Sequence, residues 1–267
     1  MATRQRNESN AIAACSFQLV FARAFDPVEM RSFSRLQQSL GDLLPGFLPD
    51  TFPTPNFQFG GINMGFGAAL GVTMQRINPA GQPQRILRIE GQALNVVWND
   101  YTRWSEVWPQ VQRIFNEVLA SMNPGNFVVA SQLHIVDQFD FIAATEYDAF
   151  ELYRPGNQYL PAHVSASGTF WHVNQGWWVP DSIDVQGRPA VLNQLNISNI
   201  QEGTSQLPGR EYSQIEHIQA ARSINFPISM AEFNPRVTGM FENMRIANQE
   251  LLRVLLTDAK LEAMGLQ

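Results

Sequence analysis

The sequence contains a single cysteine and no long apolar run. Because Cys15 stands alone in 267 residues, the chain can form neither an intrachain disulfide nor a thiolate-rich metal site. No apolar stretch approaches the roughly 20 residues that a membrane span requires. Polar residues follow Arg4 and Arg6, where a secretory leader would be apolar. We therefore expect a cytoplasmic protein without a membrane partner.

Charged residues, and basic residues above all, are scarce. They make up 16% of the chain, and 18 Lys and Arg stand against 24 Asp and Glu, for a formal net charge of -6. Nucleic-acid-binding surfaces normally show clustered Lys and Arg. The composition therefore argues against a nucleic-acid partner. The hydrophobic fraction of 45% is ample for the core of one large domain or of two tightly packed halves.

The segment from Ala13 to Pro45 predicts a strand followed by a helix. Apolar residues occupy every second position at Cys15, Phe17, Leu19 and Phe21. Cys15 should point into the core, as a small buried hydrophobe rather than a catalytic thiolate. Asp26 and Pro27 suit an N-cap and a first helical position. The prolines from Pro45 to Pro55 then predict a rigid, irregular connection.

A glycine-rich run follows, and Gly65, Gly67 and Gly71 resemble part of a phosphate-binding loop. Such a loop must lie between a strand and a helix. Here Val72 and Met74 predict another strand, so a glycine-rich hairpin or a bulged edge strand is the better interpretation.

The stretch LNVVWNDYTRWSEVW, from Leu94 to Trp108, gathers three tryptophans and a tyrosine. Period-two spacing predicts two antiparallel strands that meet near Gly91 and end at Trp98. Helical spacing follows, and Pro109 fits only in a first turn, which places the helix start close to Ser105. The candidate caps are Asp100, Thr102 and Ser105.

Two interpretations of these aromatic residues remain open. Trp98, Trp104 and Trp108 can brace the corner between strand and helix, with their rings in the core. Alternatively, Trp98, Tyr101 and Trp104 line a ligand pocket.

A second aromatic group, Trp171, His172, Trp177 and Trp178, lies in a segment that predicts a hairpin turning at Asn174-Gln175-Gly176. The group can form an aromatic cage for a ligand, or it can cover a sheet face. Further strands are expected from Phe127 to Phe141, near Val191 to Ile197, and after Arg210.

The chain should end in a long helix capped by Asn234-Pro235, followed by a short turn that starts at Thr257-Asp258 and closes at Gly265. Together these elements predict an α+β fold, in which antiparallel sheets pack against the mid-chain helix and the C-terminal helix. The alternation of sheet and helix suggests an N-terminal lobe over residues 11–160 and a C-terminal lobe over 161–267, or a single domain.

The sequence resembles a sporadically distributed family of conserved hypothetical prokaryotic proteins of about this length. The resemblance is carried by FQLVFARAFDPVEMRSFSRL, by LNVVWNDYTRWSEVWPQVQRIFNEVL and by FENMRIANQELLRVLLTDAKLEAMG. Its matching positions are Tyr101, Trp104, Thr257, Asp258 and Gly265. The family's mid-chain motif with an arginine is replaced here by HIVDQF, from His134 to Phe139. The resemblance implies a shared fold without established catalysis, and its patchy distribution suggests an accessory of mobile or defence-associated genes.

The sequence shows no nucleophile elbow, P-loop or zinc-protease helix. We therefore expect no catalytic residue, metal or cofactor, although His134 with Asp137 and Asp140, or His172 with Asp181, can converge in space. The predicted function is that of a non-catalytic protein that binds a protein partner or a second copy of itself. The alternatives are a small-ligand or nucleotide sensor with an aromatic pocket and an unrecognised enzyme.

Overall fold

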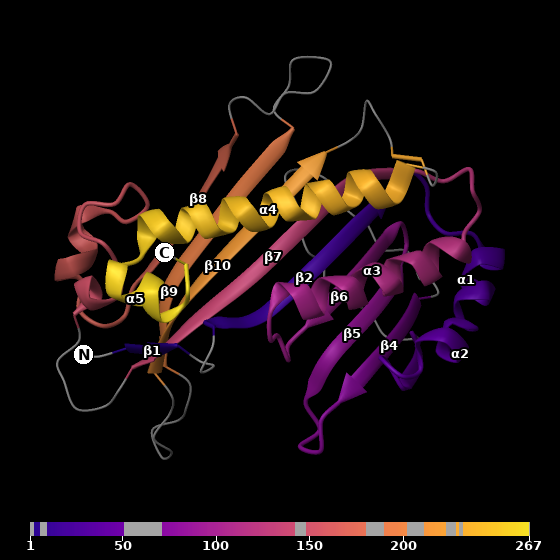
Figure 1. Ribbon diagram of the computed structural model, residues 1–267, viewed down its shortest axis with the longest axis horizontal. Coiled ribbons are helices and arrows are strands. Elements are labelled where there is room, and N and C mark those ends of the chain that lie inside the picture. Colours follow the sequence, from indigo (N-terminus) through magenta and orange to yellow (C-terminus); the bar gives the residue numbers. More distant parts are fainter. Residues whose placement is uncertain are drawn as a thin grey trace.

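The computed structural model describes residues 3–5, 10–50, 71–141, 148–179, 190–201, 211–222, 228–229 and 232–266. Its centre is one ten-stranded antiparallel sheet, in the order β3-β4-β5-β6-β2-β7-β10-β9-β8, with β1 paired to β7 (Figure 1). The strands are β1 (Thr3–Gln5), β2 (Ile12–Phe21), β3 (Gly46–Asp50), β4 (Gly71–Ile77), β5 (Pro83–Glu90), β6 (Ala93–Trp98), β7 (Val128–Phe141), β8 (His172–Trp178), β9 (Val191–Gln201) and β10 (Glu211–Arg222).

The pairing of β2 with β7 joins two halves of similar topology. In each half a central strand is followed by short helices, a three-strand meander and a long helix, and the first half has one further strand, β3, which pairs with β4. The meanders are β4-β5-β6 and β8-β9-β10, and the last strand of each pairs with its own central strand. The sheet is therefore continuous across both halves.

Both long helices lie on the same face of this sheet (Figure 1). The helices are α1 (Pro27–Phe33), α2 (Leu36–Leu40), α3 (Trp104–Ala120), α4 (Phe233–Leu255) and α5 (Asp258–Ala263), with short 3-10 helices at η1 (Ala149–Glu151) and η2 (Ala162–Ala166). The opposite face, here called the open face, carries no helix among the described residues. At its centre lie Ser16, Gln18, Gln132, His134, Glu216 and Ile218.

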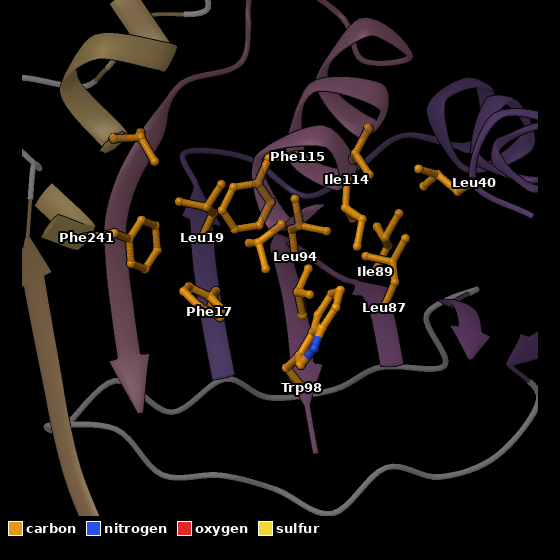
Figure 2. Packing of buried hydrophobic residues seen from close by; sticks show 14 of the residues in the cluster. Phe17, Leu19, Leu40, Leu87, Ile89, Leu94, Trp98, Ile114, Phe115 and Phe241 are labelled. Atoms are coloured by element: carbon orange, nitrogen blue, oxygen red, sulfur yellow. The ribbon is translucent and has the colours of Figure 1, made fainter. Parts of the chain in front are cut away.

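The strict alternation in β2 explains why the sheet has one apolar face. Cys15, Phe17 and Leu19 are buried, while Ser16 and Gln18 between them stay partly exposed. The helices cover the buried side, and the ring of Phe241 from α4 lies 5.6 Å from the ring of Phe17, measured between centroids. Figure 2 shows both residues among the packed apolar side chains. The predicted strand and the burial of Cys15 are confirmed.

The buried apolar side chains of the described residues form two clusters. The larger lies under α3 and the first half of α4, around Phe17, Trp108 and Phe241. The smaller lies under the second half of α4, around Tyr153 and Leu255. Helix α4 contributes residues to both clusters.

The start of α1 shows how local sequence sets an element. The Asp26 side chain accepts hydrogen bonds from the backbone N–H groups of Val28 and Glu29, and the Glu29 side chain accepts one from the Asp26 N–H. This reciprocal capping box confirms the predicted cap. The predicted helix to Pro45 is, however, interrupted after Phe33 and becomes two short helices.

Two sequence predictions about local structure are wrong. Asn174-Gln175-Gly176 form no turn, because they lie inside β8 in register with β9, where cross-strand pairing outweighs local turn preference. The connection after Pro45 is not wholly irregular, because residues 46–50 form β3 at the edge of the sheet, where a proline without an N–H is tolerated. The rest of the glycine-rich run before Gly71 lies outside the described residues.

Helix α3 starts one residue from the predicted position near Ser105, but its cap differs from the prediction. The helix begins at Trp104, and its N-cap Arg103 makes no side-chain capping hydrogen bond. Asp100 instead forms an ion pair with Arg85 at 3.0 Å, and Thr102 donates to the Glu106 carboxylate at 2.7 Å. At the other end of the chain, α5 begins after Thr257 as predicted, and Gly265 adopts a φ of 67°.

The architecture is α+β, as predicted. In the described part of the chain, no helix combines the length and apolar composition that crossing a membrane requires.

Phe241→Ala should lower the free energy of unfolding by about 3–5 kcal/mol, because it empties a fully buried site between Phe17, Trp108 and Phe115. Urea denaturation monitored by circular dichroism measures the change. Val254→Ala on the same helix is the control, since Val254 is 40% exposed and should change stability by less than about 0.5 kcal/mol. Equal effects of the two substitutions would contradict the packing described here.

Candidate functional site

A cavity of about 240 Å³ opens on the helical side of the central strands. It is bounded by the start of β2, the segment before α3, the middle of α4 and the turn after α5. Its walls include Ile12, Tyr101, Trp104, Asp137, Arg245 and Asn248. The cavity thus lies over the junction between the two halves of the sheet.

Asp137 is the most unusual residue of this cavity. Its side chain is 1% exposed, and its Oδ1 atom is buried without a hydrogen-bond partner among the described residues. A register shift between Ile12 and Ala14, opposite Asp137, marks an irregularity of β2 at this point. Bulges of this kind change the direction of side chains and often lie near functional sites.

Burial raises the pKa of Asp137 from its usual value to about 7. The cause is desolvation, which disfavours the charged carboxylate. No basic side chain forms an ion pair with Asp137 in the described part of the chain. Near neutral pH the group therefore exists in both protonation states.

A polar layer continues from Asp137 toward β10. The ring of His217 is 2% exposed and lies between two amides, with Nδ1 2.9 Å from Asn248 Oδ1 and Nε2 2.9 Å from Asn193 Oδ1. Burial lowers the pKa of His217 to about 4, despite the opposing hydrogen bond to Asn248. A neutral imidazole has one N–H, so one of the two amides must turn its NH₂ group toward the ring.

The first predicted aromatic group divides between core and cavity. Trp98 is 1% exposed in the core, with the Arg85 guanidinium 4.3 Å from its ring centroid. Tyr101 and Trp104 line the cavity. The pKa of Tyr101 is raised, chiefly by burial.

Trp104 belongs to both the core and the cavity wall. Its ring stacks on Trp108 at 5.5 Å, and its Nε1 donates to Glu242 at 2.6 Å. The Arg245 guanidinium lies 5.5 Å from the Trp104 ring centroid. The brace predicted for the strand-helix corner is therefore present, because Trp98, Trp104 and Trp108 are all buried.

The second predicted aromatic group is not gathered at one place. Alternation along β8 places Trp171 and Trp177 on the helical side, where Trp171 meets Tyr153 at 5.7 Å and Trp177 meets Tyr159 at 5.3 Å. His172 and Trp178 lie on the open face. The four side chains therefore do not form a single cage.

The catalytic combinations considered from the sequence do not assemble among the described residues. His134 and Asp137 lie on opposite faces of β7, as the period of a strand requires, and Asp140 shares the face of His134. Asp181 lies outside the described residues. Burial and the nearby Asp137 raise the pKa of the Cys15 thiol, which leaves it protonated. Within the described ranges, no three His, Cys, Asp or Glu side chains gather to hold a metal ion.

Sequence patterns did not predict that Asp137, His217, Asn248 and Arg245 are neighbours. A signal existed for three of them. Asp137 occupies the apolar phase of β7, between Ile135 and Phe139, and Asn248 interrupts the apolar stripe of α4. His217 holds the same kind of position in β10. A polar residue at a position where the period of the strand or helix places apolar ones therefore indicates the buried polar layer.

No protein-family model matches the chain, and no curated protein matches it either. The resemblance to the hypothetical prokaryotic family therefore remains a prediction.

Asp137→Asn should stabilise the protein at pH 8 and progressively less toward pH 4. In the wild type the unfolded carboxyl ionises near its usual pKa of 3.8, whereas the folded one stays protonated up to about 7. Between these values the folded state binds the extra proton, so wild-type stability falls as pH rises. The asparagine removes this loss. Chemical denaturation from pH 4 to 8 measures the free energy of unfolding of the wild type and of the variant. If the difference between the two does not vary with pH, the raised pKa of Asp137 is contradicted.

Proposed function

We propose that this chain is a non-catalytic protein that binds another protein through the open face of its sheet. The proposal rests on the position of the helices. Helices α3 and α4 cover one face of the sheet, and none of the described helices covers the other (Figure 1). A sheet face of this size is a rigid platform on which side chains from several strands are held at fixed spacing.

The centre of the open face is rich in amides that already bond to one another. Gln138 Nε2 donates to Gln214 Oε1 at 2.7 Å, Gln214 Nε2 donates to Glu216 at 2.5 Å, and Asn196 donates to the same carboxylate at 3.3 Å. These contacts hold the side chains in place before a partner arrives. Preorganised groups lose less conformational entropy on binding.

One border of the open face has the composition of a binding hot spot. Trp178 is 38% exposed, and the Arg222 guanidinium lies 5.1 Å from its ring centroid. Tryptophan and arginine are the residue types most enriched at positions that dominate binding energy. Strand β8, which carries Trp178, is also the last of the described strands at its end of the sheet, a position at which a partner can add a strand.

The charges of this face favour protein over nucleic acid. Arg88 and Arg222 are opposed there by Glu90, Asp140 and Glu216. A phosphate-binding surface needs a basic excess, and none of the described strands supplies one.

The cellular setting is part of the proposal. A cytoplasmic accessory role in a mobile or defence-associated gene system follows from the resemblance noted in the sequence. The division into two lobes is likewise a proposal, supported by the repeated element order. That repeat begins at β7, near residue 128, and the boundary predicted at residue 160 remains a prediction.

Gln132→Arg should abolish partner binding without lowering the melting temperature, because it adds a long cation at the centre of the open face. Wild-type and variant proteins are used as bait in lysate of the native cells, and captured proteins are quantified by mass spectrometry. The matched control is Ile246→Arg on α4, where the native side chain is 45% exposed on the helical side. Sedimentation velocity of the same proteins identifies a second copy as the partner. If only the Ile246→Arg control loses the partner, the open face is not the binding surface.

A further inference from the structure

We propose that the cavity beside Asp137 binds a small organic ammonium compound, whose ammonium group hydrogen-bonds to the Asp137 carboxylate. The site lies on the helical side of β7, whereas the open face lies on the other side. This inference is therefore independent of the function proposed above.

Asp137 lacks the full set of hydrogen-bond partners that buried carboxylates normally have. A buried polar atom without a hydrogen bond is costly, and native structures contain few of them. Two buried polar side chains of the neighbouring strand β10 are satisfied: Gln219 donates to the Met244 carbonyl at 2.5 Å, and His217 contacts two amides. The Oδ1 atom of Asp137 has no such partner in the described part of the chain, and Asp137 is part of the wall of the cavity.

The partner that the Asp137 carboxylate lacks should be a cation with N–H donors. The described cavity wall contains two arginines, Arg103 and Arg245. Arg103 donates to Glu106 at 2.6 Å, and the Arg245 guanidinium lies over Trp104 and pairs with Glu242 at 3.4 Å. A metal ion is a poor fit, because Asp137 is the one acidic residue among the described residues of the cavity wall, and metal ions need several ligands. An ammonium group supplies both the donors and the charge.

The rest of the ligand should match the rest of the cavity wall. Ile12, Trp104 and Leu252 give the wall an apolar part, and the Tyr101 and Trp104 rings suit contact with a cation. A cavity of about 240 Å³ accepts a molecule the size of an amino acid. The compound should therefore join one ammonium group to a short apolar chain.

The test uses three probes that share one carbon chain. These are n-butylammonium, the neutral n-butanol and L-norvaline, which is butylammonium with an added carboxylate. Binding to the full-length protein is followed by NMR, with the indole N–H of Trp104 as the local reporter. Butylammonium should shift this signal saturably, and Asp137→Asn should weaken its binding at least about tenfold while leaving butanol unaffected. Tighter binding of norvaline would identify a zwitterion as the natural ligand.

Two variants serve as controls. Asp140→Asn removes the same charge from the same strand on the open face, and it should leave butylammonium binding unchanged. Gln249→Trp narrows the cavity from its partly exposed wall on α4, and it should weaken both butylammonium and butanol. The second variant leaves Asp137 in place, so it also tests the site if Asp137→Asn disturbs the fold.

Binding should also depend on pH in a defined direction. The titratable and charged groups near Asp137 are Cys15 from β2, Tyr101 and Arg103 before α3, and Arg245 from α4. Burial raises the pKa of Cys15 and of Tyr101, so neither changes its charge between pH 6 and 8. With the Asp137 pKa at about 7, butylammonium affinity should rise about tenfold from pH 6 to pH 8, because protons compete with the ligand. Butylammonium binding that survives Asp137→Asn, or absence of saturable butylammonium binding at pH 8, would overturn the proposal.

Discussion

The antiparallel pairing of β2 with β7 is the contact on which the rest of the structure depends. It joins two meanders that are far apart in the chain into one sheet. Both long helices cover this junction, and the aromatic contacts of Phe17 with Trp108 and Phe241 fix them there. The carboxyl of Asp137 lies where the same pairing becomes irregular. The core, the cavity and the open face are therefore consequences of one strand pair.

Local pattern predicted the elements well where one signal dominated. The alternation around Phe17, the capping pair Asp26-Pro27 and the strands on either side of Gly91 all occur as expected. Prediction failed where pairing at a distance decided the outcome. The residues Asn174-Gln175-Gly176 favour a turn locally, but β9 holds them in a strand.

The candidate site was only half predictable for a similar reason. Tyr101 and Trp104 were noticed because aromatic residues are conspicuous in a sequence, and both border the cavity. Asp137 was seen only beside His134, although the strand period already separated them. Its true neighbours, such as Asn248 and Arg245, come from a helix more than a hundred residues later in the chain, and only the sheet brings them together.

Helix α4 spans 23 residues, or roughly 34 Å at 1.5 Å per residue. It rests on one apolar cluster at each end and crosses the polar layer between them at Asn248. Because the two clusters are separate, loosening of the smaller cluster under Leu255 can unfold the C-terminal end of α4 while the cluster around Phe241 stays intact.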